Sequence, residues 1–340
     1  MRMLNTLVAG STGYIGTELI KLLVNHRKIK IKYLCGNSSI GKNISLYDKS
    51  LKNKKLPKII KFNQKLLDDV DVIFTALPNG EAQKISNKLK KHHILIDLSA
   101  DFRLKNAKTY LKYYKIKHSS TKNINKSVYA LPEIKNKEIK NYKIIACPGC
   151  YPTSALLPLI PILKKNIISN KNIIIDSKSG YSGAGRGVHK KFKDRNLYES
   201  LSVYGIKTHR HNSEIQQELD IETGKQVEFT FTPYLSPMYR GILTTIYCTT
   251  LKKNNINTIL NSLKKFYKNH EFVKILKKNT LISTNHVINS NNCMISVCET
   301  KQKNKFIILS AIDNLIKGGA GQAIQNLNLM FNFNNKMGLK

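Results

Sequence analysis

The fold is decided by residues 4–23, which read LNTLVAGSTGYIGTELIKLL. A short apolar run ends at Gly10, a glycine-rich turn follows, and apolar residues then recur at helical spacing. Gly10, Gly13 and Gly16 would let the backbone approach a pyrophosphate, while the start of the helix offers N–H groups and a positive dipole. The spacing is G-x-x-G-x-x-G rather than the standard G-x-G-x-x-G, and a tight turn without a ligand is the alternative. Because this turn opens an α/β pattern, we favour a cofactor site.

The rest of the first half alternates strand-like apolar runs with polar, helix-like segments such as 80–92. Strands that alternate with helices over about 150 residues predict a Rossmann-type, doubly wound parallel sheet. The strand-like runs are 29–36, 71–78, 94–101 and 142–149.

After about Cys150 the strand-like runs become longer and alternate between apolar and polar residues. This pattern, with a helix candidate at 257–270, predicts an α+β domain with a largely antiparallel sheet. We therefore expect two domains, 1–149 and 150–316, followed by a glycine turn and helix within 317–340.

The loop after the second strand indicates which nicotinamide cofactor the turn would bind. NAD is usually held by a carboxylate at this point, which accepts a hydrogen bond from the ribose 2′-OH. Here the sequence is CGNSSIGK (35–42), without a carboxylate, and Ser38, Ser39 and Lys42 suit a 2′-phosphate. The loop favours NADP(H), with a plain polar loop as the alternative.

Two cysteines, Cys147 and Cys150, lie in IIACPGCYPTSALLPLIPIL (144–163). A structural zinc site needs four ligands, usually from two such pairs, and the sequence has no second C-x-x-C, so we expect no metal. A redox pair remains an alternative. We favour a reactive thiol, because Cys150 would open a helix, whose N-terminus favours a thiolate. Two prolines, at 158 and 161, are expected to kink this helix or end it early.

A base for this thiol is offered by GIKTHRHNSEIQQEL (205–219). The part from Asn212 onward resembles a helix start with Asn or Ser as its cap, so His211 should point from the loop before it. Histidine is the natural partner of a thiol at neutral pH, although a structural role for His209 and His211 is equally open.

The net charge of +36 invites a nucleic-acid interpretation. However, most of the basic residues are lysines spread evenly among asparagine and isoleucine, without an aromatic RNA-binding motif. We expect no specific nucleic-acid partner. The longest apolar stretch is too short to span a bilayer, no cleavable signal fits the N-terminus, and the scattered cysteines look reduced. These features predict a soluble cytoplasmic protein without a membrane partner.

Eight motifs occur in order along the chain: GSTGYIGTELIKLL, LPNGEA, DLSADFRL, CPGCYPT, SGYSGAGRG, HRHNSEI, PMYRGILTTIY and GGAGQAIQNLNLM. Together they closely resemble the N-acetyl-gamma-glutamyl-phosphate reductase family, a relative of aspartate-semialdehyde dehydrogenase. The resemblance extends from residue 10 to about residue 330. It implies an NADPH-dependent enzyme of arginine biosynthesis that reduces N-acetyl-L-glutamyl 5-phosphate through a cysteine thioester.

The resemblance assigns roles to individual residues. Cys150 matches the catalytic nucleophile, and His211 matches the acid/base residue. The C-terminal helix 317–340 would complete the NADP-binding domain, and the second domain would be catalytic and form a homodimer or homotetramer. The residues implied for NADP binding are Gly10, Ser11, Thr12, Gly13, Tyr14, Ile15, Gly16, Ser38, Ser182, Gly183 and Asn314.

Arg103, Arg210 and Arg240 are candidates for the phosphate and carboxylate of the substrate, because the planar guanidinium suits both groups. An ordinary salt bridge is the alternative for each. The family often has Thr-Pro-Glu after HRH, where this chain has Asn-Ser-Glu (212–214).

Overall fold

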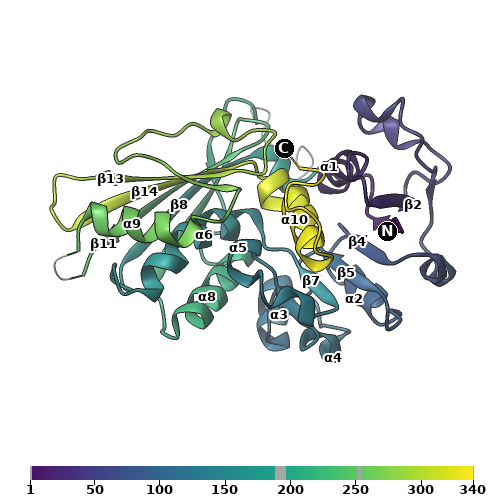
Figure 1. Cartoon of the computed structure of the whole chain (residues 1–340), viewed down its shortest axis with the longest axis horizontal. Helices are drawn as coiled ribbons and strands as arrows, with labels where there is room; N and C mark the ends of the chain where they lie inside the picture. Colours follow the sequence, from purple (N-terminus) through teal and green to yellow (C-terminus); the bar gives the residue numbers. More distant parts are fainter. Residues whose placement is uncertain (1, 188–196, 252–253, 340) are drawn as a thin grey trace. The chain divides into compact units, whose positions relative to one another are not determined.

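The computed structural model describes residues 2–187, 197–251 and 254–339. The chain forms two compact units (Figure 1). The first unit comprises Met1–Pro148 and Gly319–Lys340, and the second unit comprises Gly149–Gly318. The chain therefore passes between the units twice, just before Cys150 and just after Gly318. Within the described ranges, every helix is too short or too polar to reach across a lipid bilayer.

The sheet of the first unit is parallel throughout its described strand pairs, which confirms the predicted Rossmann-type doubly wound sheet. The two outermost strands escaped sequence prediction because two or three residues carry no readable alternation. In sheet order the strands are β3 (Ile59–Ile60), β2 (Ile29–Cys35), β1 (Leu4–Ala9), β4 (Val72–Thr75), β5 (Ile94–Asp97), β7 (Ile144–Ala146) and β6 (Ser127–Tyr129).

Both faces of this sheet are buried, which explains why its strands are continuous apolar runs. Val8 of β1 belongs to one core cluster, and its neighbours Leu7 and Ala9 belong to the cluster on the opposite face. The helices of this unit are α1 (Tyr14–Leu23), α2 (Glu81–Ser86), α3 (Ala107–Tyr114), α4 (Thr121–Ile124), α5 (Pro132–Lys135) and α10 (Gly321–Met330).

The sheet of the second unit is mixed and mostly antiparallel, as predicted. Two of its strand pairs are parallel, β8 with β10 and β12 with β13. In sheet order the strands are β12 (Val273–Ile275), β13 (Cys293–Glu299), β14 (Lys305–Ile312), β11 (Ile242–Thr249), β8 (Ile173–Gly180), β10 (Phe229–Ser236) and β9 (Ser202–Val203).

Among the described residues of this unit, three α-helices accompany the sheet: α6 (Cys150–Lys164), α8 (Arg210–Thr223) and α9 (Ile256–Tyr267). α6 packs on β11 and β14 and also contacts α8 and α9 (Figure 1). The expected early end of α6 is wrong, because the helix continues through Pro158 and Pro161. Pro161 cannot donate to the carbonyl of Leu157, and the hydroxyl of Tyr267 donates to that carbonyl at 2.6 Å instead.

Candidate active site

Cys150 is the first residue of α6, as the sequence predicted, and its side chain is partly exposed. Gly149 before it is the N-cap, with extended backbone and no capping side chain. The backbone N–H and the hydroxyl of Thr153 both donate to the Gly149 carbonyl, each at 2.9 Å. The thiol therefore lies at a helix N-terminus, where the dipole stabilises a thiolate.

Gly149 also determines what can approach Cys150. A Cβ atom at this position would lie 2.3 Å from Nε2 of His211, so only glycine lets the imidazole come this close to the backbone. The N–H of Gly149 donates to Oε2 of Glu214 at 3.0 Å, and Oε1 of Glu214 lies 3.8 Å from Nε2 of His211. Glu214 is fully buried, so its carboxylate ties the turn before Cys150 to α8.

The position of His211 differs from the prediction. We expected it in a loop before the helix, but α8 begins at Arg210 and His211 lies in its first turn. The cap is not Asn212 or Ser213 but His209, whose Nδ1 accepts the N–H of His211 at 3.1 Å. An imidazole nitrogen satisfies the helix N-terminus here, and the usual cap residues of sequence prediction do not include it.

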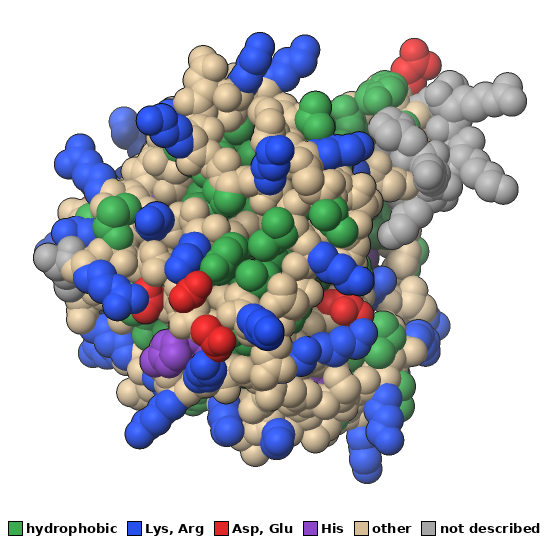
Figure 2. Space-filling view, turned by 90° about the vertical axis from the view of Figure 1, so that its right-hand side faces the viewer, with side chains coloured by type: hydrophobic (Ala, Val, Ile, Leu, Met, Phe, Trp, Pro, Cys, Tyr) green, Lys and Arg blue, Asp and Glu red, His purple; other side chains and the backbone are tan. Residues whose placement is uncertain are grey.

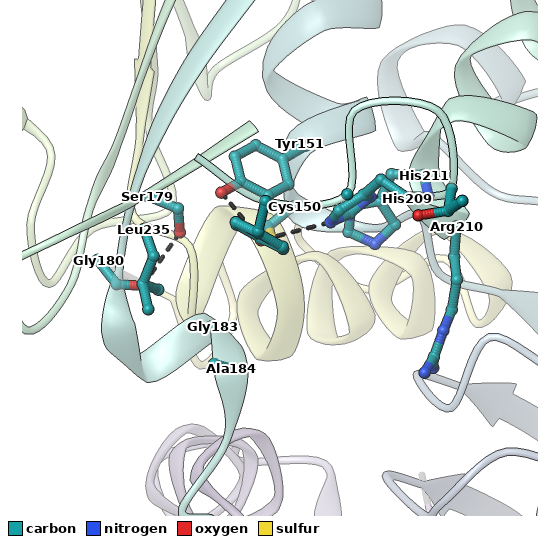
Figure 3. A pocket seen from close by; sticks show the side chains of 13 residues that line it. Cys150, Tyr151, Ser179, Gly180, Gly183, Ala184, His209, Arg210, His211 and Leu235 are labelled. Atoms are coloured by element: carbon teal, nitrogen blue, oxygen red, sulfur yellow. Dashed lines mark hydrogen bonds between the residues drawn. The ribbon is translucent and has the colours of Figure 1, made fainter. Parts of the chain in front are cut away.

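A cavity of about 500 Å³ opens over these groups. Figure 3 shows the side chains of Cys150, Tyr151, His209 and His211 close together at the wall of this cavity. The side chain of Arg210 extends away from them. The cavity is lined by Cys150, Tyr151, Ser179, Gly180, Gly183, Ala184, Tyr204, Gly205, Thr208, His209, Arg210, His211 and Leu235.

Three residues predicted to bind the cofactor lie together in the second unit. Asn314 donates from Nδ2 to the hydroxyl of Ser182 at 3.0 Å and accepts the N–H of Gly241 at 2.7 Å. Gly183 lines the cavity, and a Cβ there would lie 3.5 Å from Nδ2 of Asn314. Asn314 therefore fixes the turn that carries Ser182 and Gly183.

The three arginines have different surroundings. Arg240 forms an ion pair of 2.8 Å with the buried Asp313 and also donates to Asn289 at 2.9 Å. Arg210 is exposed at the rim of the cavity.

Arg103 is buried within the first unit. Its guanidinium donates to the carbonyls of Cys147, at 2.7 Å, and Leu98, at 3.2 Å. These bonds join the ends of β5 and β7. Arg240 thus has the ordinary salt bridge that was the alternative for it, whereas these contacts of Arg103 are to backbone carbonyls. The role of the three arginines in substrate binding stays a prediction.

The glycine turn has the form expected for close approach of a ligand. Gly10 adopts a positive φ of 86°, and a Cβ there would lie 2.2 Å from the carbonyl oxygen of Ala76. A Cβ on Gly16 would lie 2.1 Å from the carbonyl oxygen of Gly10. α1 begins at Tyr14, and its N-cap Gly13 has no capping side chain, so the first N–H groups of the helix face its open end.

The other residues of this segment divide between the fold and the surface. Ser11 is buried, and its hydroxyl donates to the carbonyl of Cys35 at 3.0 Å. Ser38 and Lys42 are exposed after β2, whereas Ser39 is buried and hydrogen bonds with Tyr47. Thr12 and Ile15 complete the predicted turn, at its centre and in the first turn of α1.

Cys147 is less accessible than Cys150, whose side chain is partly exposed. It is buried, Nδ2 of Asn326 lies 3.7 Å from its sulfur, and burial raises the pKa of its thiol to about 12. It therefore stays protonated at neutral pH and cannot act as a nucleophile there. The described residues contain no cluster of three or more potential metal ligands.

Sequence reasoning missed three residues of the site, Glu214, Tyr151 and Tyr204, and named a fourth, His209, without its structural role. Glu214 has a readable signal, because it lies three positions after His211 on a helix, which places both on one face. His209 was noticed but not recognised as the cap. Tyr151 and Tyr204 carry no local signal, because only the tertiary fold brings Tyr204 to α6.

Two family models match the chain. "Semialdehyde dehydrogenase, NAD binding domain" covers residues 5–142, and "Semialdehyde dehydrogenase, dimerisation domain" covers residues 150–314. Solved structures share the fold at low sequence identity. Aspartate semialdehyde dehydrogenase II from Vibrio cholerae is 14% identical, with a TM-score of 0.72 over 98% of this chain and 99% of its own. The Candida albicans enzyme, solved with NADP, is 16% identical, with a TM-score of 0.64 over 97% and 98%.

Several proteins called N-acetyl-gamma-glutamyl-phosphate reductase are much more similar in sequence. That of Desulforamulus reducens is 42% identical over 337 residues, which is 96% of this chain and 95% of its own length. That of Thermoanaerobacter pseudethanolicus is 44% identical over 327 residues, 95% and 94% of the two chains. A probable chloroplastic protein of this name from Oryza sativa is 40% identical over 98% of this chain and 80% of its own.

Proposed function

This chain belongs to the N-acetyl-gamma-glutamyl-phosphate reductase family, and we propose that it reduces N-acetyl-L-glutamyl 5-phosphate to the 5-semialdehyde, a step of arginine biosynthesis. NADPH supplies the hydride. One observation supports this assignment above the others: Cys150 starts a helix whose glycine N-cap contacts His211 and is held by Glu214.

The protein groups would act in a fixed order. Cys150 attacks the acyl carbon, the C–S bond forms and inorganic phosphate leaves, which gives a thioester. After reduction at that carbon, the C–S bond of the thiohemiacetal breaks and the semialdehyde is released. His211 would take the thiol proton and then move a proton at the thiohemiacetal oxygen. Backbone N–H groups at the start of α6 would stabilise the oxyanion.

We place cofactor binding on the first unit and its glycine turn. The glycines of the turn leave room for a pyrophosphate where a Cβ would collide with backbone, and Ser38 is exposed where a 2′-phosphate would lie. We place catalysis and the dimer contact on the second unit. The six cysteines of the chain form no disulfide, which fits an enzyme of the cytoplasm.

The dimer proposal rests on an open sheet face. Ile174 of β8 and Tyr247 of β11 are 45% and 42% exposed, and a second copy of this unit would cover them. Light scattering after size exclusion should give twice or four times the mass of one chain. A chain that remains a monomer at micromolar concentration would contradict the proposal. On the face that Figure 2 displays, Lys and Arg side chains are scattered rather than gathered into one patch.

The reverse reaction tests the function directly. The protein is mixed with N-acetylglutamate semialdehyde and NADP, and the absorbance of the reduced cofactor is followed with and without inorganic phosphate. Phosphate-dependent reduction is expected. Activity with aspartate semialdehyde alone would keep the thioester chemistry and overturn the substrate, whereas no reduction with either aldehyde would overturn both.

A further inference from the structure

A chain of four hydrogen bonds runs from the first turn of α8 to the first turn of α6 and on to β10. The N–H of His211 donates to Nδ1 of His209 at 3.1 Å, and Nε2 of His209 lies 3.3 Å from the hydroxyl of Tyr204. Tyr204 donates to the hydroxyl of Tyr151 at 3.2 Å, and Tyr151 donates to the carbonyl of Tyr234 at 2.8 Å. Tyr151 directly follows Cys150, so this series of hydrogen bonds links His211 to the residue beside Cys150.

The positions of the protons in this series of hydrogen bonds follow from its two ends, which are a backbone N–H donor and a backbone carbonyl acceptor. Nδ1 of His209 accepts an N–H and therefore carries no proton, so the neutral ring must carry its proton on Nε2. Nε2 then donates to Tyr204, whose own proton goes to Tyr151. The proton of Tyr151 goes to a backbone carbonyl, which can only accept. Only one tautomer of His209 satisfies all four bonds.

The surroundings of His209 favour the neutral ring. Its ring makes edge contacts with those of Tyr151, Tyr204 and Phe231, at centroid distances of 5.2 to 5.6 Å. Burial lowers the pKa of His209 to about 3, and the neighbouring His211 and Arg210 act in the same direction, whereas Glu214 opposes them. The titratable groups around it are Arg210, His211 and Glu214 on α8, Cys150 and Tyr151 on α6, and Tyr204 in the preceding loop.

We propose that His209 is a positioning residue for His211. As the neutral tautomer with its proton on Nε2, fixed by Tyr204 and Tyr151, it caps α8 and holds the His211 side chain against Gly149. Loss of this cap would let the first turn of α8 shift, and the imidazole would move relative to Cys150. The activity readout rests on the proposed function, but the tautomer and the thiol reactivity do not.

The first test compares His209→Ala with His209→Asn. Asparagine keeps an oxygen that caps a helix, whereas alanine keeps none, and the loss of one cap is a small part of the stability of a folded protein, so both variants should fold. We expect alanine to lower kcat about 100-fold, as a misplaced catalytic group does, and asparagine to restore most of it. The pH dependence of Cys150 alkylation by iodoacetamide should shift in the alanine variant and stay close to wild type in the asparagine variant.

His286 provides a matched control. Its Nδ1 also accepts a local backbone N–H, from Ser283 at 3.3 Å, but it is exposed and outside the cavity lining. His286→Ala should leave kcat and the alkylation profile unchanged. Wild-type kcat and alkylation in His209→Ala would overturn the proposal.

The second test observes the tautomer without any turnover. In the ¹⁵N spectra of histidine-labelled protein, His209 should show an unprotonated Nδ1 and a protonated Nε2 that do not titrate from about pH 5.5 to pH 9. Tyr204→Phe removes the acceptor for Nε2–H and should release this tautomer, whereas Tyr113→Phe in the other unit should not. A wild-type His209 that titrates near 6.5, or carries its proton on Nδ1, would overturn the proposal. If the tautomer and the alkylation shift are as expected but no semialdehyde is oxidised, the proposed function alone fails.

Discussion

The starts of α1 and α6 have almost the same backbone and very different surroundings. Each follows a parallel strand of the first unit's sheet, and each has a glycine N-cap in extended conformation: Gly13 at φ −70° and ψ 164°, Gly149 at φ −68° and ψ 157°. In neither helix does the side chain of the N-cap residue accept a hydrogen bond from the first turn, because both caps are glycines.

What differs is the material packed against the glycines. At α1, the nearest atoms that a Cβ on Gly10 or Gly16 would meet are all backbone atoms. At α6, Gly149 meets an imidazole, and its own N–H is held by a carboxylate. The two helix starts therefore share a backbone conformation, but it is the start of α6 that titratable side chains from a second helix contact.

The largest expected effect on either helix start is the loss of turnover in Cys150→Ser. The serine hydroxyl is a far weaker nucleophile than a thiolate, so turnover should fall by at least about 10⁴-fold while NADPH binding stays intact. Steady-state rates and cofactor fluorescence would measure the two effects. Cys298→Ser, on β13, should behave like wild type. A near-wild-type rate in the Cys150 variant would remove this cysteine from the mechanism.

Gly149→Ala tests whether the second helix start depends on the approach of His211. Its Cβ would collide with Nε2, and displacement of the imidazole should lower kcat about 100-fold without changing the cofactor Kd. Gly187→Ala is the control, because a Cβ there would meet open space. If kcat is unchanged, the contact between Gly149 and His211 has no role in catalysis.

Gly16→Ala and Gly13→Ala separate packing from binding at the first helix start. A Cβ on Gly16 would clash with the carbonyl of Gly10 and should cost about 1–3 kcal/mol of unfolding free energy. On Gly13 it would lie 3.7 Å from that oxygen, an ordinary contact, so stability should hold while the NADPH Kd rises about tenfold. Urea unfolding and cofactor titration would check both, and unchanged NADPH affinity in Gly13→Ala would mean that no ligand approaches this glycine.

The smallest expected effect is a pH dependence confined to the second helix start. Burial lowers the pKa of His209 to about 3, so near pH 6.5 this imidazole binds a proton in the unfolded chain but not in the folded chain. The contribution of His209 to stability is therefore complete above pH 6.5 and is lost as the pH falls toward 3. The urea midpoint of wild type should drop more between about pH 7 and pH 5 than that of His209→Asn. Parallel curves would contradict the lowered pKa.

The type of each sheet and the start of α6 could be predicted from the sequence, because long apolar runs and a glycine turn are local signals. The continuation of α6 through Pro161 could not be predicted, since the compensating hydroxyl of Tyr267 comes from a helix about a hundred residues later. The cap of α8 was missed for a related reason. His209 caps α8 as a buried, neutral ring whose tautomer is fixed by Tyr204, and both conditions arise from tertiary packing.

Helix α10 has a consequence for the order in which the protein can fold during synthesis. Its residues Ala323, Ile324 and Leu327 belong to the core cluster that contains Val8 of β1, and Asn328 hydrogen bonds with His26 at 2.8 Å. The first unit therefore cannot close its core until the whole second unit, Gly149–Gly318, has left the ribosome, which takes roughly 10–30 s at ordinary elongation rates. The nascent chain must keep an unfinished parallel sheet from aggregating over that interval, so the last helix acts as the late step that completes the first domain.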